Sequence, residues 1–138
     1  MNNEQEFISE LIAMTKLEGI NYLTTFLSGE DAVLRCIFFN KGISPQELAH
    51  MLNVTKGRIS VLLRNLTKKN YIEMSINKDD HRKVDLELTS VGLNYFKSIG
   101  EKAEKYFDIL FERLGKEQTE QLIAMLKKIN QVMKGVTL

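Results

Sequence analysis

Apolar residues recur at helical spacing near the start of the chain. In residues 3–17, Phe7, Leu11 and Met14 fall about one helical turn apart, with Ile8 and Ile12 beside them. Such spacing predicts an amphipathic helix whose apolar stripe is wide enough to serve two partners. Gly19 is expected to weaken or end this helix, although residues 20–27 keep an apolar pattern that a helix could use.

A second predicted helix, residues 29–40, is almost entirely apolar between Ala32 and Phe39 and should be largely buried. Ser28 followed by Asp31 resembles a capping arrangement at its start. Lys41 and Gly42 are expected to stop it.

Two short helices then follow each other closely. Ser44 is expected to cap the first, with Pro45 at its first position, and Thr55 to cap the second, which runs to about Lys69. Ala49 is small enough for a close helix crossing, and Asn53 tolerates the positive φ that a tight turn between them needs. Val54, Ile59 and Leu62 are expected to face inward, and Asn70 to end the second helix in the left-handed conformation. This order predicts a helix-turn-helix.

A β-hairpin is predicted next. Residues 84–88 alternate strictly between apolar and polar, which is typical of a strand with one solvated face. Residues 71–76 form the expected partner strand, with a turn at Asn77–Asp80. Helical spacing returns over residues 89–114 and 117–134, with a glycine between them. The chain therefore predicts an α-rich α+β fold.

Composition adds little until the charge is divided along the chain. The 138 residues are 43% hydrophobic and 27% charged, with a net charge of +1, as in an ordinary globular domain. Residues 1–54 carry a net charge of −4, whereas residues 55–83 carry eight basic and three acidic side chains. A local excess of this kind is expected for a polyanion partner, and an ordinary solvated surface explains it as well.

The second helix of the helix-turn-helix presents this charge on its outer face. With its apolar positions inward, the outward residues are Thr55, Lys56, Gly57, Arg58, Ser60, Val61, Arg64, Asn65 and Lys68. A basic face with short side chains can enter the major groove of DNA, and the free N–H groups at the helix start can hold a phosphate. The plain alternative is an ordinary amphipathic helical pair.

The sequence resembles the MarR family of winged helix-turn-helix transcriptional regulators over most of its length. The resemblance is carried by Leu48-Ala49-x-x-Leu52-x-Val54, by Ile59-x-x-Leu62, and above all by residues 80–92, where Asp80, Arg82, Leu88, Thr89 and Gly92 match the family pattern. Asn53 departs from it where a glycine is usual, and Val61 where a basic residue is frequent.

Membership in that family implies one MarR-like domain over residues 1–138. A winged helix-turn-helix core would span about 29–89, with dimerisation helices at about 3–27 and 90–136. It implies a homodimeric regulator, most simply a repressor, that binds a pseudo-palindromic duplex. Arg82 would then reach into the minor groove from the wing, oriented by Asp80, with Lys83 beside it. A winged-helix module that binds an acidic partner protein is the alternative function.

Other chemistry finds little support in the sequence. The only cysteine, Cys36, lies in the most apolar predicted helix and fits a core thiol in a reducing cytoplasm. His50 and His81 lie far apart with no ligand cluster, so we expect no metal, although His81 could flank a phosphate. No phosphate loop or nucleophile motif is present, and no cofactor or enzymatic activity is expected.

A small effector is the remaining expectation. Four aromatic residues could line a cavity for a small aromatic or lipophilic molecule: Tyr22, Phe26, Phe38 and Phe39. Ordinary core packing explains the same residues equally well. The sequence does not choose between the two interpretations.

Overall fold

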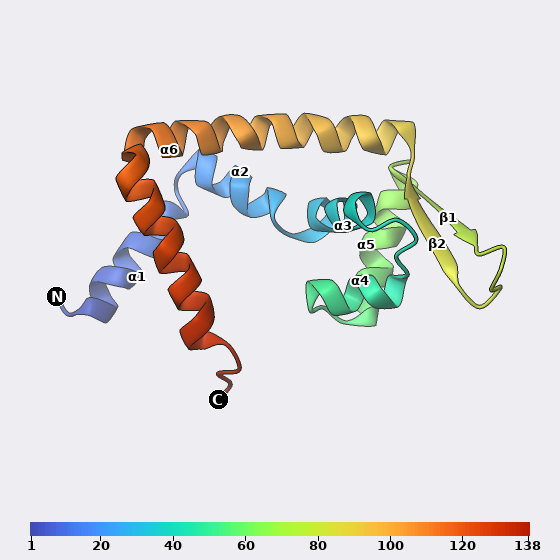
Figure 1. Ribbon diagram of the computed structural model, residues 1–138, viewed down its shortest axis with the longest axis horizontal. Coiled ribbons are helices and arrows are strands. Elements are labelled where there is room, and N and C mark those ends of the chain that lie inside the picture. The colour runs from blue at the N-terminus through green and yellow to red at the C-terminus, as the bar shows by residue number, and fades with distance from the viewer. The chain divides into compact units, whose positions relative to one another are not determined.

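The computed structural model describes residues 1–138 as six helices and one two-stranded sheet (Figure 1). The elements, in order, are α1 (Asn3–Met14), α2 (Glu18–Phe26), α3 (Gly29–Phe39), α4 (Pro45–Leu52), α5 (Lys56–Lys68), β1 (Ile72–Ile76), β2 (Val84–Leu88) and α6 (Ser90–Met133). The chain forms two compact units, residues 1–103 and 104–138. No helix combines the length and the apolar character that a membrane crossing needs. The predicted α-rich fold is confirmed.

The break between α1 and α2 lies earlier than predicted. Asn2 and Gln5 form a reciprocal capping box at the start of α1. The helix ends at Met14, and the Thr15 hydroxyl donates to the carbonyl of Ile12 at 2.6 Å. Gly19 was the expected stop, but it lies in the first turn of α2, where a glycine costs least because that turn has few intrahelical hydrogen bonds.

The cap predicted for α3 is wrong in detail. Ser28 precedes the helix in extended conformation, but its side chain makes no capping hydrogen bond. Its hydroxyl instead donates to the carbonyl of Thr24, one turn back in α2, at 2.9 Å. Gly29 follows with a φ of +58°. The hydroxyl therefore closes the end of α2 rather than opening α3.

The helix-turn-helix follows the predicted local rules. Ser44 accepts a hydrogen bond from the Glu47 amide at 3.1 Å and Thr55 from the Arg58 amide at 3.1 Å, which satisfies one free N–H at each helix start. Asn53 ends α4 in the left-handed conformation with a φ of 52°, as the turn requires. Val54 was expected to face inward, but 36% of it is exposed. It lies in the turn between the two caps, beyond the helix faces that pack.

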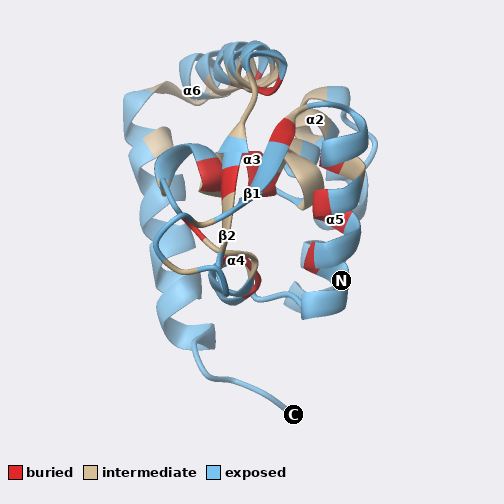
Figure 2. Cartoon of the chain, turned by 90° about the vertical axis from the view of Figure 1, so that its right-hand side faces the viewer, coloured by how far each residue is buried: buried red, intermediate tan, exposed pale blue.

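One apolar core joins α3, α4, α5 and both strands. Its fully buried members are Val33, Leu34, Leu48, Ile59, Leu66, Ile72 and Leu86. Figure 1 shows α3, α4 and α5 grouped beside the hairpin, and Figure 2 shows the buried residues on these elements. The core takes one side of α5 and leaves the other side in solvent. No polar or charged residue is buried.

The hairpin is antiparallel, with Ile72 opposite Leu88 and Met74 opposite Leu86. The predicted strand at 84–88 is confirmed. The turn is longer than predicted, because residues 77–83 form the loop and the Asn77 amide donates to the Lys83 carbonyl at 3.0 Å. The three extra residues make room for a projecting wing.

The start of α6 approaches the end of α5 closely enough to require glycine. The Thr89 amide donates to the Tyr71 carbonyl at 3.0 Å, and the Thr89 hydroxyl donates to the Asn70 carbonyl at 2.6 Å. The Gly92 amide in turn donates to the Thr89 hydroxyl oxygen at 2.9 Å. A Cβ atom on Gly92 would lie 1.9 Å from the Tyr71 carbonyl oxygen. The pattern Leu-Thr-x-x-Gly thus has a direct steric cause.

Replacing Gly92 by alanine is expected to lower the free energy of unfolding by about 3 kcal/mol or more, because a backbone carbonyl cannot move aside as a side chain can. Gly100, also in α6, has no atom within 4 Å of an added Cβ. Gly100→Ala should therefore stabilise the protein by up to about 1 kcal/mol through helix propensity. Urea denaturation measures both, and equal stabilities for the two variants would contradict the close approach.

Candidate nucleic-acid interface

The outer face of α5 carries the side chains that the sequence assigned to DNA. Eight of the nine assigned residues in this region are exposed, namely Thr55, Lys56, Gly57, Arg58, Ser60, Val61, Arg64 and Lys68, and Asn65 is half-buried. The opposite side of α5 is locked into the core by Ile59, Leu62, Leu63 and Leu66. The structure therefore brings the assigned residues together on one solvent-facing helix surface.

The first turn of α5 is exposed to solvent. Its cap, Thr55, uses its hydroxyl for the Arg58 amide, and the Ser60 hydroxyl donates back to the Lys56 carbonyl at 3.0 Å. An added Cβ at Gly57 would meet nothing closer than the Thr55 hydroxyl oxygen, at 3.9 Å. The fold therefore does not require glycine at position 57. Because Gly57 has no side chain, this turn of the helix presents little steric bulk.

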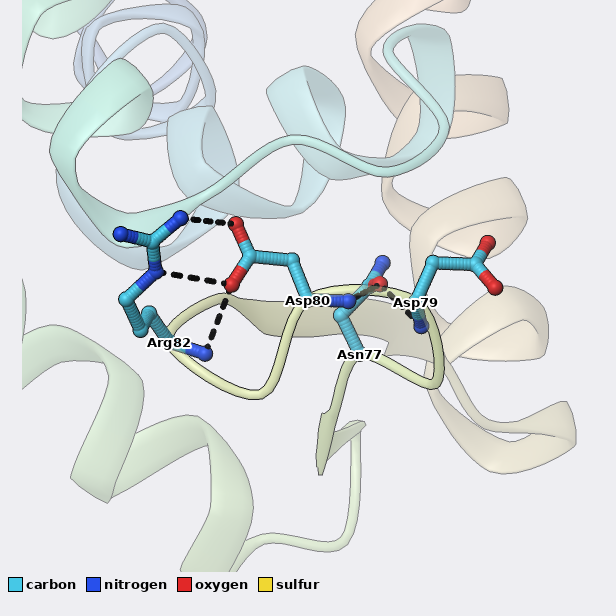
Figure 3. Close-up of polar contacts among 4 residues, drawn as sticks. All are labelled: Asn77, Asp79, Asp80 and Arg82. Atoms are coloured by element: carbon cyan, nitrogen blue, oxygen red, sulfur yellow. Dashed lines mark hydrogen bonds and ion pairs between the residues drawn. The ribbon is translucent and has the colours of Figure 1, made fainter.

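The wing loop is held by two side chains that accept several hydrogen bonds each (Figure 3). The Asn77 side-chain oxygen accepts from the backbone amides of Asp79 and Asp80, each at 2.8 Å. The Asp80 carboxylate accepts from the Arg82 amide at 3.0 Å and from its Nε at 3.1 Å. Figure 3 shows the Arg82 guanidinium facing Asp80, while the Asp79 side chain points away.

The hydrogen bonds of the wing loop favour an ionised Asp80 near neutral pH. The side-chain and backbone hydrogen bonds from Arg82 hold the pKa of Asp80 below its ordinary value. The ion pair is therefore present above that ordinary value and is lost as the pH falls through the lowered pKa. Arg82 itself is 91% exposed at its side chain, so its guanidinium is oriented without being covered.

One basic residue near this surface, Lys69, is paired with an acidic residue of another helix. The Lys69 ammonium donates to the Glu30 carboxylate at 2.7 Å, and that hydrogen bond raises the pKa of Lys69. Lys69 follows α5, whereas Glu30 belongs to the first turn of α3. The sequence places Lys69 within the local positive charge, and no sequence signal marks its partner 39 residues away.

A groove of about 750 Å³ lies between α4 and the wing. Gln46, Glu47, His50 and Met51 line it from α4, and Arg82 and Lys83 line it from the wing. The sequence did not assign α4 residues to the interface. Polar residues at helical spacing on α4, namely Gln46, Glu47 and His50, were the available signal, but they become informative only once the wing is placed opposite them.

The four aromatic residues predicted around an effector divide into two sets. Phe38 and Phe39 contact Phe96 of α6, with ring centroids 5.0 and 6.5 Å apart. Phe26 instead holds the Arg35 guanidinium at 4.3 Å from its ring, and Tyr22 holds the Lys102 ammonium at 4.6 Å. Phe38 also lines a cavity of about 270 Å³ together with apolar residues of α3, β2 and α6: Ile37, Leu86, Leu88 and Leu93.

Neither the cysteine nor the histidines lie in a reactive or metal-binding arrangement. Cys36 is half-buried beside the core, and burial raises the pKa of its thiol, which disfavours the reactive thiolate. No cluster of three or more His, Cys, Asp or Glu side chains could hold a metal ion. His50 and His81 are both exposed, the first on α4 and the second in the wing loop.

Comparison with known proteins agrees with this geometry. The family model described as winged helix DNA-binding domain matches residues 30–107. The HTH-type transcriptional regulator FarR of Neisseria gonorrhoeae is 28% identical over 123 residues, covering 87% of this chain and 84% of FarR. The HTH-type transcriptional repressor YetL of Bacillus subtilis is 32% identical over 90 residues, covering 58% of this chain and 54% of YetL.

Solved structures show the same fold. Escherichia coli MarR in its apo form superposes with a TM-score of 0.67 at 25% identity, over 88% of this chain and 95% of that one. Streptococcus pneumoniae FabT, solved in complex with DNA, superposes with a TM-score of 0.80 at 18% identity, over 98% and 100%. The relatives are transcription regulators and not enzymes. The chain belongs to the winged helix DNA-binding family, as a regulator of the MarR type.

Proposed function

We propose that this regulator is a repressor that binds a pseudo-palindromic duplex as a homodimer, with α5 in the major groove and the wing in the minor groove. The observation that carries the proposal is the pairing of an exposed basic α5 face with a wing whose arginine is oriented yet uncovered. An acidic protein partner would not require both features at once. The cytoplasmic location predicted from the sequence stays a prediction.

The α5 face supports the major-groove assignment. A B-DNA major groove about 12 Å wide admits one helix, provided that the side chains at the point of entry are short. Gly57 and Ser60 meet that condition in the first two turns, and Arg58 lies between them with a side chain that reaches base edges. Arg64 and Lys68, further along, are placed for phosphates on the groove rim.

The wing supports the minor-groove assignment. Arginine inserted into a narrow minor groove responds to its width and to its negative potential. Asp80 fixes the Arg82 guanidinium by two side-chain hydrogen bonds, at 3.1 and 3.4 Å, so that less side-chain entropy is lost on binding. Lys83, next along the chain, is exposed and adds a second charge for the backbone.

Exposed apolar surface supports the homodimer. In α1, Phe7 is 62% and Ile12 is 53% exposed, and in the last part of α6, Leu126 is 51% and Met133 is 58% exposed. Apolar residues exposed to this extent on each of the two segments are uncommon on a monomer and favour an interface. A two-fold dimer would repeat α5 and match a pseudo-palindromic duplex.

The effector is proposed for the cavity that Phe38 lines. Its apolar walls suit a small aromatic or lipophilic molecule, and Lys41 and Glu87, which also line it, supply one charge of each sign for a polar group of that molecule. Phe39 and Phe96 extend the aromatic surface beside it. Tyr22 and Phe26 are left out of this proposed site because their rings already hold cations.

The two arginines should affect binding differently. With a duplex selected from a random pool, Arg58→Ala should cost about 1–3 kcal/mol and relax the preference at one base pair. Arg82→Ala should weaken binding to many sequences alike and reduce the salt dependence, with a mild loss of A·T preference. Asp80→Ala should reproduce part of the Arg82 effect, since the carboxylate only holds the guanidinium. Titrations against matched and mismatched duplexes measure this, and unchanged base preference in Arg58→Ala would refute the α5 placement.

Affinity should fall steeply with salt. A dimer that neutralises about 6–10 phosphates loses roughly 10³- to 10⁵-fold in affinity between about 50 and 200 mM salt. Lys68→Gln should lower the slope by about one for each phosphate that is no longer neutralised, whereas Lys69→Gln should change it little because Lys69 is paired with Glu30. Fluorescence anisotropy at several salt concentrations decides. A flat response would favour an acidic protein partner instead.

The protein is expected to sediment as a dimer at micromolar concentration. Leu126→Glu should shift it to monomer, because the residue is exposed in the single chain and its charge opposes only the interface. Ile76→Glu, at a 66% exposed position in β1 and outside the predicted dimerisation helices, is the matched control and should remain dimeric. Sedimentation of the unaltered chain as a monomer would rule out the dimer.

A further inference from the structure

The carboxyl end of α5 is joined to α3 and α6 by a polar aromatic contact that the interface does not use. The Tyr71 ring, just after α5, stacks on Tyr95 of α6 with centroids 4.5 Å apart and planes at 11°. The Tyr95 hydroxyl donates to the Asp31 carboxylate of α3 at 2.9 Å. Three separate elements therefore meet at three side chains.

Unlike a contact between apolar core residues, the Asp31–Tyr95 contact places polar groups in a partly buried position. Burial raises the pKa of Asp31, and the hydrogen bond from Tyr95 opposes that shift. Burial and the Asp31 carboxylate both raise the pKa of Tyr95, so the hydroxyl keeps its proton and donates it. Half-buried polar groups cost desolvation that well-packed apolar residues would avoid. The desolvation of the Asp31–Tyr95 pair is therefore offset by the hydrogen bond between them.

Tyr71 transmits that geometry to α5. Its amide donates to the Leu66 carbonyl in the last turn of α5 at 2.9 Å, and its carbonyl accepts from the Thr89 amide. The 13 residues of α5 make a helix about 20 Å long. A tilt of about 5° around its carboxyl end would move its other end by ~1.7 Å, more than a hydrogen bond to a base tolerates.

We propose that Asp31 and Tyr95 are positioning residues for DNA binding, which hold Tyr71 against α6 and so set the angle at which α5 meets the duplex. The inference rests on the proposed function of α5. Neither residue touches DNA. Their effect reaches the duplex through Tyr71 and the end of α5.

The chain offers a matched control. The Tyr22 hydroxyl of α2 donates to the Ile99 carbonyl of α6 at 3.1 Å. Tyr22→Phe therefore removes a tyrosine hydroxyl bonded to another element, as Tyr95→Phe does, but leaves the Tyr95–Asp31 hydrogen bond in place. Asp31→Asn is the conservative variant, because its amide oxygen still accepts from Tyr95, whereas Asp31→Leu removes the acceptor.

The first measurement is affinity for the selected duplex and for a mixed-sequence duplex. Tyr95→Phe and Asp31→Leu should bind the selected duplex about three- to tenfold more weakly, a usual size for coupling through a network of packed side chains. Their affinity for the mixed-sequence duplex should be unchanged. Tyr22→Phe and Asp31→Asn should stay within about twofold of the unaltered protein for both duplexes. If Tyr95 and Asp31 had a purely structural role, replacing them would change thermal stability without changing the ratio of the affinities for the selected and the mixed-sequence duplexes.

The second measurement is amide hydrogen exchange in the free protein. Tyr95→Phe should speed exchange of the Tyr71 amide, and Tyr22→Phe should not, because only the first loosens the end of α5. Unchanged exchange and unchanged duplex affinity in Tyr95→Phe would overturn the inference. If Arg58→Ala weakens binding while Tyr95→Phe does not, the positioning role fails and the proposed function stands. If the unaltered protein binds no duplex, the proposed function fails, and Tyr71 exchange still decides whether Tyr95 fixes α5.

Discussion

The close approach of α6 to the Tyr71 carbonyl is the constraint on which the rest of the structure depends. Glycine at position 92 permits it, and Thr89 completes it with hydrogen bonds to the carbonyls of Asn70 and Tyr71. Because Tyr71 also closes the last turn of α5 and precedes β1, this one junction relates the helix, the hairpin and α6 to each other. Gly92, Thr89 and Tyr71, which lie outside the proposed DNA-binding surface, therefore set the positions of α5 and the hairpin.

Burial on one side of α5 explains why its other side is available. Four apolar residues, Ile59, Leu62, Leu63 and Leu66, anchor the helix in a core that contains no charged group. The charged side chains within residues 55–83 have no core position to occupy, so they gather on the outer face and the wing. Lys69 differs from these side chains because it forms an ion pair with Glu30 of α3. The distribution of charge on this surface therefore follows from the positions of the apolar residues that enter the core.

Much of this was predictable from local rules. The caps at Ser44 and Thr55, the left-handed turn at Asn53, the strand at 84–88 and the outward face of α5 each depend on neighbouring residues, and each is confirmed. Some misses are local, as at the Ser28 cap, the end of α1 and the exposed Val54, and the others depend on contacts between distant residues or on loop length. The Lys69–Glu30 pair, the Tyr95–Asp31 bond and the groove beside His50 require knowledge of which elements meet. The longer wing loop arose because Asn77 pairs with Lys83 rather than closing a tight turn.

We propose that two copies of α5 read one duplex with the wings alongside. Selection of bound duplexes from a random pool, followed by sequencing, tests it most directly. We predict an inverted repeat whose half-sites are about 10 base pairs apart, centre to centre, or a multiple of that spacing. Enrichment of no sequence, or of a single half-site without symmetry, would contradict it.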